Sequence, residues 1–223
     1  QYIDSMGSYI PAWLSRQLPS QCMVCGSWPA KVMCSDCMAR FQHPAMRCHT
    51  CALRLPDASN GDQCGQCLLH PPLLKHCVAA VDYGYPWASL LTQWKFHADP
   101  ALTRHLAQWL LQSPSWLPLR DQSPLTIPVP LAPQRLRERG YNQSLLLAQA
   151  LNCPNIHSQL LQRTHETPTQ VRQGRAARLR NLRGAFAVAP THHAILTGRA
   201  VLLVDDVITT GATLHAAAQA LLA

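Results

Sequence analysis

The order of hydrophobic and polar positions predicts an α/β protein organised around one stretch near the end of the chain. Residues 201–204 are aliphatic throughout, which is typical of a strand covered on both faces in a parallel sheet. Two acids, threonines and a glycine follow, and residues 214–223 favour a helix. Because open α/β sheets bind ligands at the carboxyl ends of their strands, this turn is the first candidate site.

The remaining pattern predicts further strands and helices upstream of this stretch. Strands are expected at 78–83, 125–127, 156–161 and 185–188, and helices at 86–94, 101–111 and 144–151. Pro128 and Pro130 place a strand end at Ile127, because proline removes a ladder donor. Residues 132–142 are predicted to form a basic turn. Pro71-Pro72 forms a stiff join, so we expect an N-terminal module at 1–74 and an α/β domain at 75–223.

Cysteine pairs dominate the N-terminal third. Two C-x-x-C turns can supply four thiolates to one tetrahedral metal ion. We therefore predict two structural zinc sites, with consecutive pairs sharing an ion; interleaved pairing of the first with the third is the alternative. A disulfide framework needs a secreted context, which nothing signals. Eight of the ten cysteines form these pairs: Cys22/Cys25, Cys34/Cys37, Cys48/Cys51 and Cys64/Cys67.

Positive charge is concentrated in the second half of the chain. The net charge is +8, and ten arginines lie between Arg135 and Arg199, where only Glu138 and Glu166 are acidic. This excess favours a polyphosphate ligand, a nucleic acid or both; the alternative is a solvated basic face. No run of about eighteen apolar residues occurs, so membrane insertion is not expected.

The chemistry of the turn after residue 204 suits a phosphorylated sugar. Asp205 and Asp206 can accept hydrogen bonds from sugar hydroxyls or hold a hydrated Mg²⁺. Gly211 lets the backbone approach a ligand, and the free N–H groups of a helix start attract an anion. The alternative interpretation is a core strand followed by an acidic turn and a threonine-capped helix.

The stretch Val201-Leu202-Leu203-Val204-Asp205-Asp206-Val207-Ile208-Thr209-Thr210-Gly211-Ala212-Thr213 resembles the phosphoribosyl-diphosphate (PRPP) signature of type I phosphoribosyltransferases. The resemblance implies that the two acids contact the ribose hydroxyls and that Thr209, Thr210, Gly211, Ala212 and Thr213 cradle the 5-phosphate. It also implies a pyrophosphate-contacting loop around Arg139. A hood loop containing Arg172, Arg175 and Arg178 would close over PRPP and exclude water.

Taken together, the motifs resemble the ComF family of competence and DNA-utilisation proteins. The resemblance rests on the cysteine pairs, on Pro128-Val129-Pro130-Leu131, on Arg139-Gly140-Tyr141-Asn142-Gln143 and on the signature above. It implies a double zinc ribbon joined to a type I phosphoribosyltransferase fold, a parallel sheet flanked by helices. It further implies a cytoplasmic bacterial protein that handles incoming single-stranded DNA, with a competence helicase or other DNA-processing proteins as partners. Type I domains add at least one more strand after the helix that contains Ala223.

Two functional hypotheses follow. In the first, the protein is an enzyme that binds PRPP with Mg²⁺ across Asp205 and Asp206, and a nucleophile displaces pyrophosphate at the anomeric carbon. No residue of the sequence identifies the acceptor. In the second, the protein is a non-catalytic accessory that retains a phosphoribosyl pocket and binds single-stranded DNA through arginines and stacking rings such as Tyr141.

Overall fold

The computed structural model describes residues 21–28, 32–57, 59, 61–96, 102–164, 182 and 184–223. The chain divides into two compact units, Gln1–His43 and Pro44–Ala223, and each is described by itself. The predicted hood-loop arginines Arg172, Arg175 and Arg178 lie outside the described residues.

The described part of the first unit is a cysteine turn followed by a short helix. Gly26, at φ +73°, closes the turn by donating its N–H to the carbonyl of Cys22 (2.8 Å). The helix, α2 (Ser35–Phe41), carries Asp36 in its first turn and Arg40 in its last. Both charges oppose the helix dipole favourably. The two cysteine pairs of this unit flank the loop between turn and helix.

The second unit begins with a hairpin that carries the other two cysteine pairs. Arg47 and Arg54 form an antiparallel bridge, and a short helix, α3 (Gly65–Leu69), follows. Cys48, Cys64, Cys67 and Leu55 form a small buried cluster there. Since one leucine accompanies three thiols, apolar burial alone contributes little to the stability of this hairpin.

The α/β part is built on two parallel strands. β1 (Leu125–Pro128) pairs with β4 (Val201–Val204), with Leu125 opposite Val201. Thr126 also bridges Ile156 in parallel, and its N–H and C=O bond to residues 155 and 157. β1 therefore has parallel neighbours on both edges. A second pair, β2 (Leu161–Arg163) with β3 (Phe186–Val188), is antiparallel. The predicted parallel α/β arrangement around residues 201–204 is confirmed at this level.

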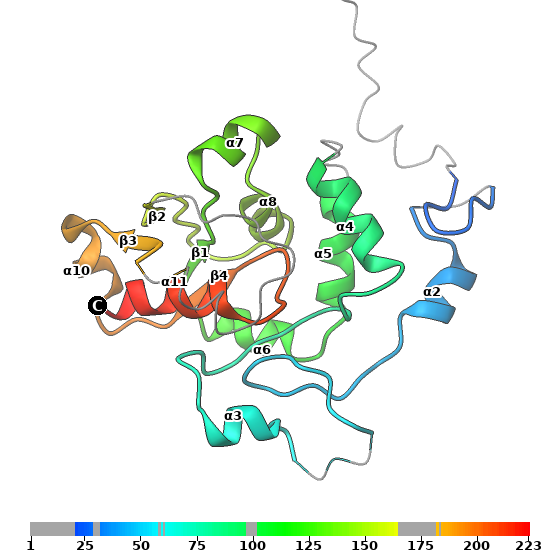
Figure 1. The fold of residues 1–223 in the computed structure, drawn as a ribbon, viewed down its shortest axis with the longest axis horizontal. Helices are drawn as coiled ribbons and strands as arrows, with labels where there is room; N and C mark the ends of the chain where they lie inside the picture. The colour runs from blue at the N-terminus through cyan, green and yellow to red at the C-terminus, as the bar shows by residue number, and fades with distance from the viewer. Residues whose placement is uncertain are drawn as a thin grey trace, which may run out of the picture. The chain divides into compact units, whose positions relative to one another are not determined.

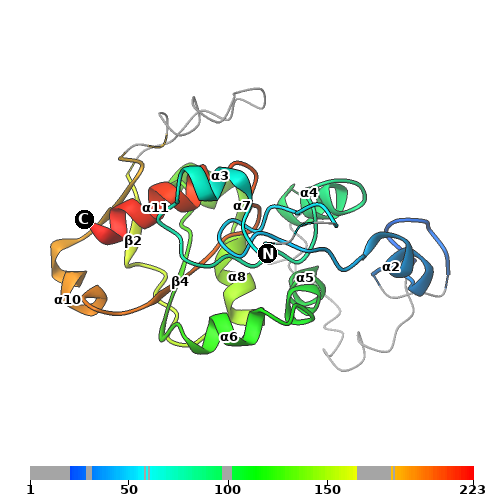
Figure 2. The same cartoon turned by 90° about the horizontal axis from the view of Figure 1, so that it is seen from below.

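Helices cover this sheet. α4 (Trp87–Phe96), α5 (Leu102–Leu111) and α6 (Trp116–Asp121) precede β1. α5 packs against α8 (Gln143–Ala150), which contacts both β1 and β4 (Figures 1 and 2). The remaining elements are α7 (Pro133–Arg139), the 3-10 helix η1 (Pro190–His192), α10 (His193–Leu196) and α11 (Ala212–Leu222). No described helix is both long enough and apolar enough to cross a bilayer.

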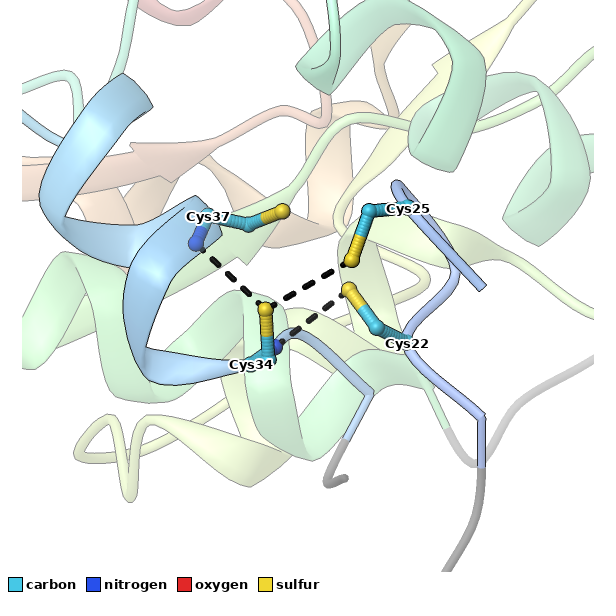
Figure 3. A group of neighbouring side chains, drawn as sticks. All are labelled: Cys22, Cys25, Cys34 and Cys37. Atoms are coloured by element: carbon cyan, nitrogen blue, oxygen red, sulfur yellow. Dashed lines mark hydrogen bonds between the residues drawn. The ribbon is translucent and has the colours of Figure 1, made fainter. Parts of the chain in front are cut away.

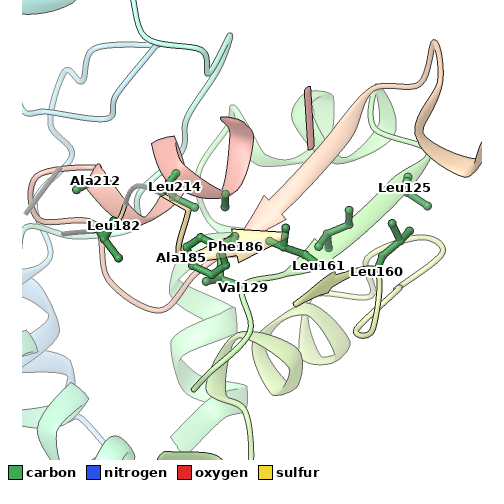
Figure 4. Close-up of a cluster of buried hydrophobic side chains, with 12 residues drawn as sticks. Leu125, Val129, Leu160, Leu161, Leu182, Ala185, Phe186, Ala212 and Leu214 are labelled. Carbon is green, nitrogen blue, oxygen red and sulfur yellow. The ribbon is translucent and has the colours of Figure 1, made fainter. Parts of the chain in front are cut away.

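The main core lies between α11 and the strands (Figure 4). Ala212, Ala216 and Ala217 are buried on α11, and positions four apart share one face of a helix. Their small side chains let the helix lie close to Ile127 and Phe186 in the same cluster. This packing fixes α11 directly after the turn that leaves β4.

Three expectations about local structure are wrong. Residues 78–83 form no strand, because their side chains pack toward α4 and α5 rather than pairing with a ladder. The segment 132–142 contains α7 instead of a plain turn: Pro133 pre-sets the first helical position and Gly140, at φ +77°, ends the helix. The strand expected at 156–161 begins at Leu161, and Ile156 makes only an isolated bridge.

Candidate functional site

The first cysteine cluster brings the first two C-x-x-C pairs together (Figure 3). The sulfur atoms of Cys22, Cys25, Cys34 and Cys37 all lie within 4.8 Å of one another. Cys25 Sγ and Cys34 Sγ are 3.7 Å apart. Two thiolates on one tetrahedral zinc ion at about 2.3 Å stand about 3.8 Å apart, whereas a disulfide needs about 2.05 Å. The four side chains therefore fit a structural zinc ion.

Backbone N–H groups in this cluster favour the thiolate form that zinc requires. The N–H of Cys34 points at Cys22 Sγ, and that of Cys37 at Cys34 Sγ, each at 3.4 Å. Burial raises the pKa of Cys22, but the N–H groups of Cys34, Cys25 and Val24 outweigh it and lower the pKa to about 6. The turn thus prepares one ligand for deprotonation before the metal arrives.

The second cluster, of Cys48, Cys51, Cys64 and Cys67, repeats this geometry in the other unit. Its sulfur atoms also lie within 4.8 Å of one another, and Cys51 Sγ is 3.7 Å from Cys64 Sγ. Burial raises the pKa of Cys48, yet backbone N–H groups bring it down to about 6. All ten cysteines are free thiols. The consecutive pairing is the one found in the structure, and interleaved pairing and a disulfide framework are not.

The second cluster also holds a neighbouring segment that the sequence did not connect with it. Arg47 Nη1 lies 2.6 Å from Asp82 Oδ1, and Arg54 Nη1 lies 3.5 Å from Asp82 Oδ2. The N–H of Cys77 donates to the carbonyl of His49 at 2.7 Å. Residues 77–82 are therefore tied to the hairpin that carries Cys48 and Cys51.

The acid pair lies where β4 ends. Asp205 Oδ1 accepts a hydrogen bond from Ser144 Oγ at 3.3 Å and another from the N–H of Asp206 at 2.9 Å. Burial, followed by the negative charge of Asp206, raises the pKa of Asp205 from 3.8 to about 7. Two adjacent carboxylates in a sheltered place are a strained arrangement that a cation or a sugar hydroxyl would relieve.

Asp206 already has one cationic partner. Lys95, in the last turn of α4, places Nζ 2.9 Å from Asp206 Oδ2, with the two side chains 20% and 13% exposed. Sequence reasoning did not link these residues, which are far apart in the chain and brought together only by the packing of α4. The ion pair keeps a positive group at the end of β4.

The glycine of the next loop has a structural cause. Gly211 adopts φ +72° as the residue that begins α11, a conformation that side chains disfavour. Thr210 Oγ1 accepts from the N–H of Ala212 at 3.4 Å. Thr209 is exposed, and Thr210 and Thr213 are half-buried. The loop therefore presents hydroxyl and N–H groups at the start of an eleven-residue helix, as the sequence predicted.

Arg139 is brought toward the same acids. It ends α7, donates from Nη1 to Gln143 Oε1 at 3.2 Å, and feels the charge of Asp206. Burial lowers its pKa, an effect that Asp206 opposes. Gln143 is fully buried, and its Nε2 has no hydrogen-bond partner in the described structure. A buried donor without a partner is costly, so this corner is suited to receive an acceptor such as a phosphate oxygen.

Replacing Asp205 with asparagine should stabilise the protein at alkaline pH. The folded pKa of Asp205 exceeds its ordinary value, so its contribution to stability is full below the unfolded pKa and is lost as pH rises through the folded one. The free energy of unfolding of Asp205→Asn, relative to wild type, should rise by about 2 kcal/mol between pH about 4 and pH about 8. Urea unfolding at both pH values measures it. Asp121→Asn, at an exposed acid, should show no such pH dependence; an equal response in both variants contradicts the assignment.

Comparison with known proteins gives relatives along nearly the whole chain. The DNA utilization protein YhgH of Escherichia coli is 33% identical over 220 residues, covering 92% of this chain and 92% of that protein. Competence protein F of Haemophilus influenzae is 33% identical over 195 residues, covering 82% and 81%. Competence protein ComFC of Bacillus subtilis is 36% identical over 102 residues, covering 46% and 40%. No family profile and no solved structure matches the chain. With two paired cysteine clusters and relatives of this identity over most of its length, the chain belongs to the ComF family of competence and DNA utilization proteins.

Proposed function

We propose that the protein binds PRPP with Mg²⁺ and transfers its phosphoribosyl group during the handling of incoming single-stranded DNA. One observation carries the proposal. Asp205 and Asp206 follow a parallel strand and are succeeded, five residues later, by the positive-φ Gly211 that starts α11. This arrangement offers carboxylates to a ribose and N–H groups to its 5-phosphate within one turn.

The proposed roles divide along this turn. Asp205 and Asp206 would hold the ribose hydroxyls and, through water, Mg²⁺, which prefers oxygen ligands. Thr209, Thr210, Gly211, Ala212 and Thr213 would hold the 5-phosphate. Lys95 now neutralises Asp206, and we propose that it turns to a phosphate when PRPP arrives, since both are anionic partners of similar strength.

The pyrophosphate end has its own candidates. Arg139 carries a permanent charge beside the acids, and the unpaired Nε2 of Gln143 is a further donor. Donors at this position would stabilise the negative charge that develops on departing pyrophosphate. The role of Arg172, Arg175 and Arg178 as a hood loop stays a prediction, as does the boundary near residue 74 between a zinc-ribbon module and a phosphoribosyltransferase domain.

Isothermal calorimetry with PRPP and Mg²⁺ tests the proposal. We expect saturable heat with a dissociation constant in the micromolar range, which is usual for substrates. Ribose 5-phosphate should bind more weakly, because it lacks the pyrophosphate that Arg139 and Gln143 would contact. Pyrophosphate release, screened over bases, amines and oligonucleotides, then identifies the acceptor.

A second function is favoured by the relatives, which are named for DNA utilization and competence. In this alternative the protein binds single-stranded DNA without catalysis, through arginines such as Arg135 and Arg137 on α7. The same experiments separate the two. A purely DNA-binding protein would give no heat with PRPP, and its affinity for an oligonucleotide would fall steeply with salt as phosphate contacts are screened.

A further inference from the structure

Beside the acid pair lies a cavity that the proposed phosphoribosyl site does not use. Its volume is about 130 Å³, and it is bounded by residues 78–83, by α4 and α5, and by residues 205–208. Three tryptophans, Trp87, Trp94 and Trp109, form part of its lining, together with Leu106 and Leu110. All of these elements belong to the second unit. One end of the cavity is thus carboxylate and the rest is aromatic and aliphatic.

The tryptophan rings are held in fixed orientations. Trp87 and Trp109 meet edge to face, with ring centroids 4.7 Å apart and planes at 69°. The indole N–H of Trp94 donates to Thr103 Oγ1 at 3.0 Å. Each of the three side chains is less than 10% exposed. Rings that are already immobilised lose little entropy when a ligand packs against them, which is the character of a formed binding site.

The size of the cavity selects its ligand. An engineered apolar cavity of about 150 Å³ in another protein holds one benzene molecule. The cavity here is slightly smaller, so it accommodates one six-membered ring and not a fused bicyclic one. Flat aromatic walls favour a planar ring, and the carboxylates of Asp205 and Asp206 at one end favour a ring that carries an N–H donor.

The mouth of the cavity carries features that suit a longer ligand. Tyr83 lines it and is 58% exposed, so its ring is available to stack on a neighbouring base. Asp82, next to it, is anchored by Arg47 and Arg54 of the second cysteine hairpin. The wall formed by residues 78–83 is therefore supported without being part of any sheet or helix.

We propose that this cavity binds a single-ring base, a pyrimidine, as the free base or unstacked from single-stranded DNA, next to the phosphoribosyl site. The inference rests on the proposed function for the identity of the ligand beside Asp205 and Asp206. Tyr83 favours the DNA-borne base, because a second base can stack there only if the first belongs to a strand.

Tryptophan fluorescence tests the inference, since three of the six tryptophans line the cavity. Thymidylate and adenylate decamers and free thymine serve as probes. The thymidylate decamer should quench the emission saturably and bind about tenfold more tightly than the adenylate decamer. Free thymine should bind more weakly than the decamer if Tyr83 and the phosphates contribute; equal affinity per base assigns the cavity to the free base.

A cavity-filling substitution supplies the decisive comparison. Ala80 lines the cavity and is half-buried, so Ala80→Leu should weaken thymidylate binding by about tenfold. Ala194→Leu, an equal change at an exposed position of α10, should leave it unchanged. PRPP heat should be the same in both variants and in wild type.

The outcomes separate this inference from the proposed function. Unchanged thymidylate affinity in Ala80→Leu, or equal affinity for the adenylate decamer, overturns the pyrimidine assignment even if PRPP binds. Absence of PRPP heat in wild type, with thymidylate binding still sensitive to Ala80→Leu, overturns the phosphoribosyl site and leaves the base site standing. A melting temperature matching that of Ala194→Leu shows that Ala80→Leu is folded.

Discussion

Replacing Cys64 with serine is expected to lower the zinc content of the protein from about two ions to about one per chain and to destabilise the second unit severely. Cys64 is buried and lies in the second four-sulfur cluster. Structural zinc sites contribute roughly 10 kcal/mol of apparent binding free energy, and the apolar cluster around Cys64 contains only Leu55 besides the thiols. Elemental analysis and thermal unfolding, with and without a chelator, measure the two effects.

Cys153 provides the matched control. It is buried and free but belongs to neither four-sulfur cluster, so Cys153→Ser should retain about two zinc ions. A wild-type protein without zinc would remove the metal assignment altogether. The loss should also reach the cavity, because Arg47 and Arg54 hold Asp82 from the same hairpin. Thymidylate binding, where it survives, should therefore weaken in Cys64→Ser.

Replacing Asp205 and Asp206 together with asparagine is expected to reduce PRPP binding by about 100-fold or more. Hydrogen bonds to charged groups contribute about 1.5–3 kcal/mol each, and both carboxylates would contact the ribose or its hydrated Mg²⁺. The calorimetric titration used for wild type measures the loss. Loss of binding cannot be attributed to unfolding at position 205, because burial of the Asp205 carboxylate makes asparagine the more stable residue above neutral pH.

Two controls sharpen this test. Asp121→Asn removes an exposed acid that pairs only with Arg120 among the described ion pairs, and PRPP binding should not change. Lys95 is half-buried and loses its partner when Asp206 is replaced, so Lys95→Met combined with Asp206→Asn separates loss of the carboxylate from the cost of an isolated ammonium. Wild-type affinity in the double asparagine variant would exclude these acids from the site.

Some features follow from local chemistry and were predictable from the sequence. Strand β4 and helix α11 were predicted because an all-aliphatic run and an alanine-rich run have few alternatives. The consecutive pairing of cysteines followed from short loops, which bring neighbouring C-x-x-C turns together most easily. Gly211 was expected at a special backbone position, and its φ of +72° agrees.

Other features could not be predicted, because the signal was misleading or nonlocal. Residues 78–83 alternate like a strand, yet their apolar positions are satisfied by the tryptophans of α4 and α5. The helix α7 was missed because charged residues hid the start and stop signals at Pro133 and Gly140. The ion pair of Lys95 with Asp206 and the anchoring of Asp82 join residues that only the folded chain brings together.

The sequence alone thus determined the chemistry available to this protein: eight paired thiols, two adjacent acids and a glycine turn before a helix. These depend on residue type and short spacing, which local backbone geometry converts directly into structure. Only the tertiary structure decided what faces the acids, because that depends on how α4, α5 and residues 78–83 pack around the end of β4. Packing brings distant segments together, and no local pattern encodes which of them will meet.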